Sequence, residues 1–273
     1  MSDAAVFTKF EVYTRIRGGT IVAWELNPLF ATQTPLTFRI LVSRSAAGDF
    51  IQIGSVADTF VFEDSRQWIY GKSPSLHYQV RFAHEGVTYA SAVTQAIGNL
   101  NARDTAIMHD MIRREELRQR LTGYCGYLYK RRVWGTRCTA CVDYNTHQIT
   151  NAACTTCYGT GFVGGYFDPV MYHVVDTTAP KARRKLVDPT TSMTDNKTRY
   201  VRSLKCPWLD TRDVWVDFDS DRRYVVQTVQ DLEFRGITFV FDPVELRLAP
   251  ATDIVYQLPR PEDSSSSSSS GSA

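Results

Sequence analysis

The chain has 273 residues, of which 43% are hydrophobic and 22% charged, so it is long enough for more than one globular domain and too apolar to be disordered throughout. Its formal net charge of +2 excludes a uniformly basic field, so any attraction to nucleic acid must come from local patches. No stretch approaches the roughly 18 apolar residues that span a bilayer, and the first residues lack a signal-peptide core. We therefore expect synthesis in a reducing cytoplasm and no membrane partner.

Residues 1–100 alternate short apolar and polar runs, which turn signals such as Gly18-Gly19 and Glu85-Gly86 separate. The runs fall at residues 10–13, 21–26, 36–42, 50–53, 59–62, 77–82 and 89–93. Seven short strands at this spacing predict a β-sandwich. Trp24 lies in the second run, and the last two runs flank the Glu85-Gly86 turn, so the region resembles a fibronectin type III or immunoglobulin-like domain.

Residues 101–137 are expected to form a helical linker. Apolar side chains recur near helical spacing over residues 104–121, with charged residues between them. This periodicity predicts an amphipathic helix with Asp104 as its N-cap. We expect its apolar stripe to face a core and its charged face to be solvated; that face consists of Arg113, Arg114, Glu115, Glu116, Arg118 and Arg120.

Four cysteines form two CxxC pairs: Cys138 with Cys141 and, after an interval of twelve residues, Cys154 with Cys157. Each pair can present two thiolates from one tight turn, and four thiolates complete the tetrahedral shell of a structural Zn²⁺. A redox dithiol is the alternative, but two pairs exceed what that chemistry needs. The sequence therefore predicts a zinc-binding module over residues 138–175, with a closed metal site that holds the chain together.

The second cysteine pair runs into Gly159, Gly161 and Gly164, whose spacing satisfies the dinucleotide-binding pattern but which follow a metal knuckle rather than a strand. We expect these glycines to take positive φ as the chain turns back beneath the metal. His147 and His173 could replace a thiolate. With four cysteines present, each is interpreted as a surface histidine.

The remaining sequence divides into an arm, a domain and a tail. Residues 176–205 are polar and interrupted by Pro180 and Pro189, which indicates an extended loop or arm. Strand signals return at residues 214–218, 223–229, 237–241, 244–248 and 254–258, so residues 206–260 are expected to form a small antiparallel β-barrel or sandwich. Residues 261–273 contain seven consecutive serines and are expected to be a disordered tail. The predicted fold is thus mainly β and multi-domain.

Two basic clusters are candidates for contact with DNA or with another subunit. The residues concerned are Lys130, Arg131, Arg132 and Arg137 in the first cluster, and Lys181, Arg183, Arg184 and Lys185 in the second. Either cluster could bind phosphate, or it could form ion pairs at a subunit interface. No catalytic constellation accompanies them: the sequence has no Gly-x-Ser-x-Gly, no HExxH and no Cys/His nucleophile context. We therefore expect a structural or interaction protein and not an enzyme.

Two segments carry a family resemblance. Residues 132–170, with Trp134, the four cysteines and the glycines after them, resemble the cysteine module of tailed-bacteriophage virion proteins at the head-to-tail junction. Residues 213–259, with the predicted strands of the C-terminal domain, are similar to the β-domain of connector, neck or head-closure proteins. Together these segments cover about half of the chain.

The resemblance implies a neck protein of the virion, which forms a homo-oligomeric ring of twelve copies between the portal or an adaptor and the tail proteins. Phage DNA would pass through the lumen, and the arm at residues 176–205 would reach a neighbouring subunit or the tail. Two alternatives remain open. One is a zinc-ribbon nucleic-acid-binding protein that uses the basic clusters, and the other is an enzyme with an accessory fibronectin-like domain.

Overall fold

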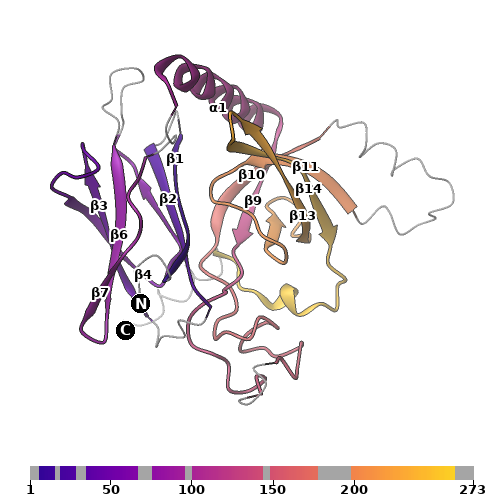
Figure 1. Cartoon of the computed structure of the whole chain (residues 1–273). Coiled ribbons are helices and arrows are strands. Elements are labelled where there is room, and N and C mark those ends of the chain that lie inside the picture. Colours follow the sequence, from indigo (N-terminus) through magenta and orange to yellow (C-terminus); the bar gives the residue numbers. More distant parts are fainter. Residues whose placement is uncertain are drawn as a thin grey trace, which may run out of the picture.

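The computed structural model describes residues 6–15, 19–28, 35–66, 76–95, 100–143, 148–177 and 198–261. These residues are mainly β, as the sequence predicts, and contain one α-helix. Figure 1 shows two β-sheets on one side, a barrel on the other, the helix α1 across the top and the cysteine-bearing segment below the barrel. Within the described residues, no helix is long and apolar enough to cross a membrane.

Two antiparallel sheets are built from the seven runs predicted in residues 1–100. The first has the order β1 (Phe7–Arg15), β2 (Gly19–Leu26) and β5 (Val61–Asp64). The second has the order β4 (Ile51–Ala57), β3 (Thr37–Ser43), β6 (His77–His84) and β7 (Val87–Ala90), with β8 (Thr94–Gln95) also paired to β6. The last predicted run is broken between β7 and β8 at Ser91, where the backbone N–H of Val80 donates to Ser91 Oγ at 3.0 Å.

The two sheets face each other across an aromatic core. Trp24 of β2 and Phe38 of β3 are fully buried, and their rings lie 5.1 Å apart. Phe38 in turn lies 5.5 Å from Phe82 of β6. Alternation along β6, in which every second residue is buried up to Phe82, is the pattern of a strand with one face on a core.

Helix α1 (Ala102–Thr122) begins two residues before the predicted start. Asp104 is not its N-cap, so that prediction is wrong: the cap is Asn101, whose Oδ1 accepts from the Asp104 backbone N–H at 2.8 Å. Asn101 Nδ2 donates back to Asp104 Oδ2 at 2.9 Å, a reciprocal pair that resembles a capping box. Met108 and Ile112 bury the helix against the rest of the protein.

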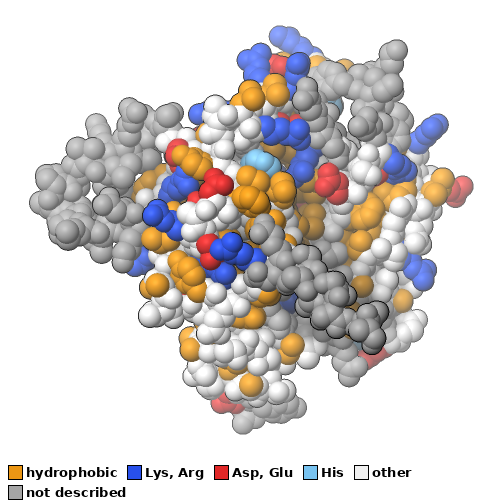
Figure 2. Space-filling model, turned by 180° about the vertical axis from the view of Figure 1, so that it is seen from behind, with side chains coloured by type: hydrophobic (Ala, Val, Ile, Leu, Met, Phe, Trp, Pro, Cys, Tyr) orange, Lys and Arg blue, Asp and Glu red, His pale blue; other side chains and the backbone are white. Residues whose placement is uncertain are grey.

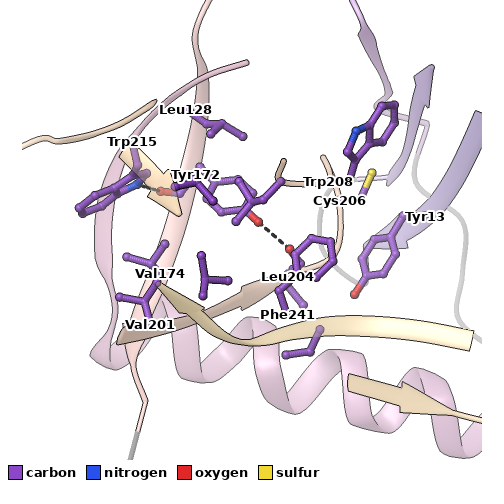
Figure 3. Close-up of a cluster of buried hydrophobic side chains, with 14 of the residues drawn as sticks. Tyr13, Leu128, Tyr172, Val174, Val201, Leu204, Cys206, Trp208, Trp215 and Phe241 are labelled. Carbon is purple, nitrogen blue, oxygen red and sulfur yellow. Dashed lines mark hydrogen bonds between the residues drawn. The ribbon is translucent and has the colours of Figure 1, made fainter. Parts of the chain in front are cut away.

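A closed six-stranded antiparallel barrel forms the other half of the molecule. Its strands, in spatial order, are β10 (Val170–Asp176), β11 (Thr198–Leu204), β14 (Ile237–Leu248), β13 (Arg223–Phe234), β12 (Val214–Asp217) and β9 (Tyr124–Tyr129). The barrel therefore takes strands from the ranges expected to be linker, zinc module and arm, as well as from residues 206–260. Part of the interior is shown in Figure 3, where Tyr172 donates its hydroxyl to Leu204 O at 2.7 Å and Trp215 Nε1 donates to Tyr172 O at 3.2 Å.

Two strand predictions near the C-terminus need correction. The runs at 237–241 and 244–248 form one strand, β14, and Pro243 lies within the irregularity that the ladders on both sides show between Phe241 and Val244. The run at 254–258 is not a strand but contains a 3₁₀-helix, η3 (Ile254–Gln257). The side chain of Asp253 caps this helix by accepting the backbone N–H of Val255. Arg223 Nη1 donates to the carbonyls of Val255 and Leu258.

The sheet β1-β2-β5 is covered on both faces, which joins the two halves through continuous packing. Val22 and Trp24 face the second sheet, whereas Ile21 and Ala23 belong to the core that also fills the barrel and contains Met108 of α1. Tyr13 of β1 donates its hydroxyl to Phe239 O of β14 at 3.3 Å. The sandwich is thus packed directly against the barrel.

Candidate metal centre

The structure brings the four predicted cysteine ligands together. Their Sγ atoms lie within 4.8 Å of one another, and each residue is buried. The Sγ atoms of Cys138 and Cys154 are 3.9 Å apart, close to the roughly 3.8 Å edge of a tetrahedron with metal–sulfur bonds of about 2.3 Å. Those of Cys141 and Cys157 are 3.0 Å apart, which is too long for a disulfide bond of about 2.05 Å. All four cysteines are free, so this cluster can bind a metal ion.

Short-range backbone hydrogen bonds hold each cysteine turn. Val142 donates its N–H to Cys138 O at 3.2 Å. Thr150 donates both its N–H and its hydroxyl to Cys141 O, at 2.7 and 2.9 Å. Thr160 likewise donates its N–H and its hydroxyl to Cys157 O, at 2.9 and 2.7 Å. The ligand positions are therefore set by the fold of the segment itself.

The glycines after the second pair take positive φ, as predicted. Gly159 has φ +72°, and a Cβ at this position would lie 2.6 Å from Ala152 O. Gly165 has φ +66°, and its Cβ would lie 2.5 Å from Cys157 O. Because the chain passes so close to itself, side chains at these two positions would force the backbone of the cysteine segment apart.

The backbone favours a thiolate at one of the four positions. The N–H groups of Cys157 and Thr156 donate to the Cys154 sulfur and lower its pKa to about 6. Burial raises the pKa of the Cys138 and Cys141 thiols, so these two would be deprotonated by a bound cation rather than by the protein alone. His173, considered above as a replacement ligand, lies on β10 outside the cysteine cluster, and His147 lies outside the described residues.

Side chains that flank the cysteines anchor the segment to the β-sandwich. Trp134 is fully buried, with ring distances of 5.6 Å to Phe38 and 5.0 Å to Phe167. Arg132 forms a two-pronged ion pair with Asp58, at 2.8 and 2.7 Å. Its guanidinium also lies 4.4 Å from the Phe167 ring centroid. The cysteine cluster is therefore held against the first half of the chain.

The first basic cluster is largely turned inward, since none of its four residues is fully exposed. Arg132 is buried by the pair just described, and Lys130 is only 3% exposed. Arg131 is half-buried, and Arg137 is half-buried with its guanidinium 5.5 Å from the Phe162 ring. The second cluster, Lys181, Arg183, Arg184 and Lys185, lies outside the described residues.

Lys130 lies in a buried ionic cluster where the cysteine segment leaves the barrel. Its Nζ is 2.6 Å from Asp210 Oδ2 and 2.8 Å from Asp213 Oδ2. Asp213 is fully buried and also accepts the backbone N–H groups of Arg131 and Asp210, at 2.9 and 2.7 Å. Burial opposes the charged form of Lys130, but the two carboxylates outweigh it and the pKa of Lys130 is raised.

Asp210 and Asp213 were missed by the sequence reasoning. The sequence signal is weak, because residues 210–213 read as a polar turn between Leu209 and Val214. The burial of Asp213, and the choice of Lys130 as its partner, depend on the pairing of the barrel strands.

Comparisons with known proteins add no identification. No family model, no curated protein and no solved structure matches this chain. The geometry of the cysteine cluster, the ionic cluster and the continuous core is therefore the basis for inferring what the protein does.

Proposed function

We propose that the protein is a structural component of a tailed-bacteriophage virion. In this proposal identical subunits form a ring of twelve in the neck, which joins the portal or an adaptor to the tail and lets DNA pass. The observation that carries the proposal is the packing of the sheet β1-β2-β5 on both faces, which makes the sandwich, helix and barrel one continuously packed body. A ring under internal load needs subunits of fixed shape and a heterologous contact that closes.

The metal in this proposal is a structural Zn²⁺. Four thiolates from Cys138, Cys141, Cys154 and Cys157 would fill its tetrahedral shell and leave no position for water or substrate. Bound there, Zn²⁺ would supply folding energy and cross-link the two turns, with no catalytic step. The protein is accordingly proposed not to be an enzyme.

The sandwich is proposed to be a fibronectin type III-like domain. A three-stranded antiparallel sheet faces a larger one, and Trp24 of the second strand is fully buried between them. Both features support the resemblance seen in the sequence. Because the outer face of β1 and β2 is covered by the barrel and α1, the sandwich would serve as a wall of the subunit.

Residues 178–197 are proposed to be the arm that reaches a neighbouring subunit. They lie outside the described residues, but the strands on either side of them pair directly, with Asp176 opposite Val201. Thr177 donates its N–H to Tyr200 O at 3.1 Å. The ends of the segment are therefore close enough for a short turn to replace it without opening the barrel.

This pairing defines the experiment. Size-exclusion chromatography with light scattering of the intact chain, without DNA, should give an assembled species of about 370 kDa, twelve times 30.9 kDa. A variant with a four-residue Gly-Ser turn in place of residues 178–197 should keep the thermal transition of the intact chain but remain a monomer. A monomer from the intact chain at all concentrations and salt conditions would overturn the ring. The same result with submicromolar, salt-sensitive DNA binding would favour the zinc-ribbon alternative.

A further inference from the structure

The charges of α1 are divided between its two sides. Of its four acidic residues, Asp104 and Glu116 are buried, Glu115 pairs with Arg202 at 3.1 Å, and Asp110 pairs with Arg114 at 2.7 Å. Four of its five arginines are exposed: Arg103, Arg113, Arg114 and Arg120. A helix whose formal charges nearly cancel therefore presents a mostly positive outer surface.

The four exposed arginines form a basic ridge of two rows on the outer half of the helix. At about 100° per residue, Arg103 and Arg114 lie in one row and Arg113 and Arg120 in the other, about 100° further round. At 1.5 Å per residue, the axial distance from Arg103 to Arg120 is about 25 Å. Figure 2 shows Lys and Arg side chains gathered at the top of the molecule, the height at which Figure 1 places α1. This ridge, defined by Arg103, Arg113, Arg114 and Arg120, is distinct from both basic clusters identified in the sequence.

We propose that the arginine ridge of α1 binds the phosphate backbone of duplex DNA. Guanidinium groups match phosphate oxygens in a two-pronged geometry. Positive charge that is spread in two rows over about 25 Å of helix, at about 1.5 Å per residue, can meet several phosphates of a polyanion at once, which a single small anion does not offer. Phosphate contacts carry no sequence information, so binding would be independent of sequence.

A protein partner fits this surface less well. The core of a protein interface is apolar and contains few charged residues, and the arginines that are enriched at interfaces accompany such an apolar core. On α1 the exposed large apolar residues are Ile107 and Leu121, which lie fourteen residues, or about 21 Å, apart with Asp110 and Arg114 between them. No contiguous apolar patch on this helix could form the centre of such an interface.

The inference deepens the proposed function and rests on it for its biological meaning, since the ridge would be the surface that faces DNA in the lumen. The binding itself does not require the ring. Assembly is measured without DNA, and DNA binding can be measured on the loop-replaced monomer as well as on the intact chain. Failure of one proposal is thus separable from failure of the other.

The test is fluorescence anisotropy with a labelled 20-base-pair duplex at several salt concentrations. Because Arg114 is paired with Asp110, the phosphate contacts come from Arg103, Arg113 and Arg120, and three contacts give a slope of log K against log salt of about −2.7, or a fall of about 40-fold between 50 and 200 mM salt. The triple variant Arg103→Gln, Arg113→Gln, Arg120→Gln should reduce the slope to near zero. Exposed glutamine is nearly as good a helix former as arginine, so the variant should fold normally.

A matched control removes the same charge elsewhere. Arg39, Arg44 and Arg222 are exposed on the sandwich and barrel, and their triple substitution by Gln should leave the slope near that of the unmodified chain. Equal losses in both triple variants, or no salt-dependent binding by the unmodified chain, would overturn the proposal. So would loss of self-association in the helix variant without any DNA binding, which would assign the ridge to a second copy.

Discussion

Replacement of Lys130 by Met tests the buried ionic cluster most directly. The substitution keeps much of the side-chain volume but leaves Asp213, which is fully buried, without its cationic partner. Breaking a buried pair costs about 3–5 kcal/mol, and because two backbone N–H groups still bond Asp213, we expect the lower end, about 3 kcal/mol. The melting temperature should then fall by about 6–12 °C.

Denaturation followed by tryptophan fluorescence suits this measurement, because Lys130 Nζ lies 5.4 Å from the Trp208 ring centroid. Lys9→Met is the control: Lys9 pairs with Asp210 of the same cluster, but both side chains are about 40% exposed, so its loss should cost no more than about 1 kcal/mol. Equal, small effects of the two substitutions would refute the reasoning.

The pH dependence of the Lys130→Met deficit has a definite sign. Burial raises the pKa of Asp213 above its unfolded value even in the native protein, so the folded state binds the proton more tightly than the unfolded state. Loss of Lys130 raises that pKa further. The deficit should therefore shrink as the pH falls from 7 toward 5, as measured by parallel urea titrations, and a deficit that grows at low pH would contradict a buried, unpaired Asp213.

Three further predictions concern the cysteine segment. Protein purified under reducing conditions should contain about one Zn²⁺ per chain, and Cys154→Ser should lose most of it in metal analysis, whereas folded protein that carries no metal as purified, with all four cysteines already open to alkylation, would contradict the site. Trp134→Ala should lower the free energy of unfolding by about 3–5 kcal/mol, because Trp134 is fully buried. The control Phe218→Ala, at a half-exposed position, should lower it by much less. Similar losses in the two variants would argue against the burial of Trp134. Gly159→Ala should destabilise the protein more than Gly86→Ala does in chemical denaturation. Both glycines have positive φ, but only Gly159 has a backbone oxygen within 3 Å of the added Cβ. The reverse order would show that the backbone near Gly159 moves to make room for the added methyl group.

Local sequence patterns predicted the features that depend on residues close together in the chain. The spacing of the two CxxC pairs was sufficient to place four sulfurs together, because each pair folds within its own turn. Alternation predicted β6, whose residues alternate between core and surface. In β2 the apolar run from Ile21 to Trp24 does not alternate. An unbroken apolar run is typical of a strand that is buried on both faces, as β2 is.

The sequence could not show which residues that are distant in the chain become partners in the fold. Lys130 and Arg132 were grouped with their basic neighbours, but their partners are 74 or more residues away, at Asp58 and Asp213. The strand β9 was assigned to a linker because its apolar residues acquire a role only through pairing with β12 and β10. Sequence periodicity reports how a strand is buried but not which strand lies beside it.

The segment that bears the candidate metal centre is fixed at both of its ends, and this determines what a bound metal would contribute. Residues 131–137 run outward and residues 162–166 return beside them, joined by bridges between Arg131 and Tyr166 and between Arg137 and Phe162. Buried ion pairs with Asp213 and Asp58 close the inner end of this two-stranded ribbon, and the four cysteines close the outer end. Because Trp134 is buried between these ends, loss of the metal should release the outer turns first, while the barrel and sandwich, which share their own core, remain folded.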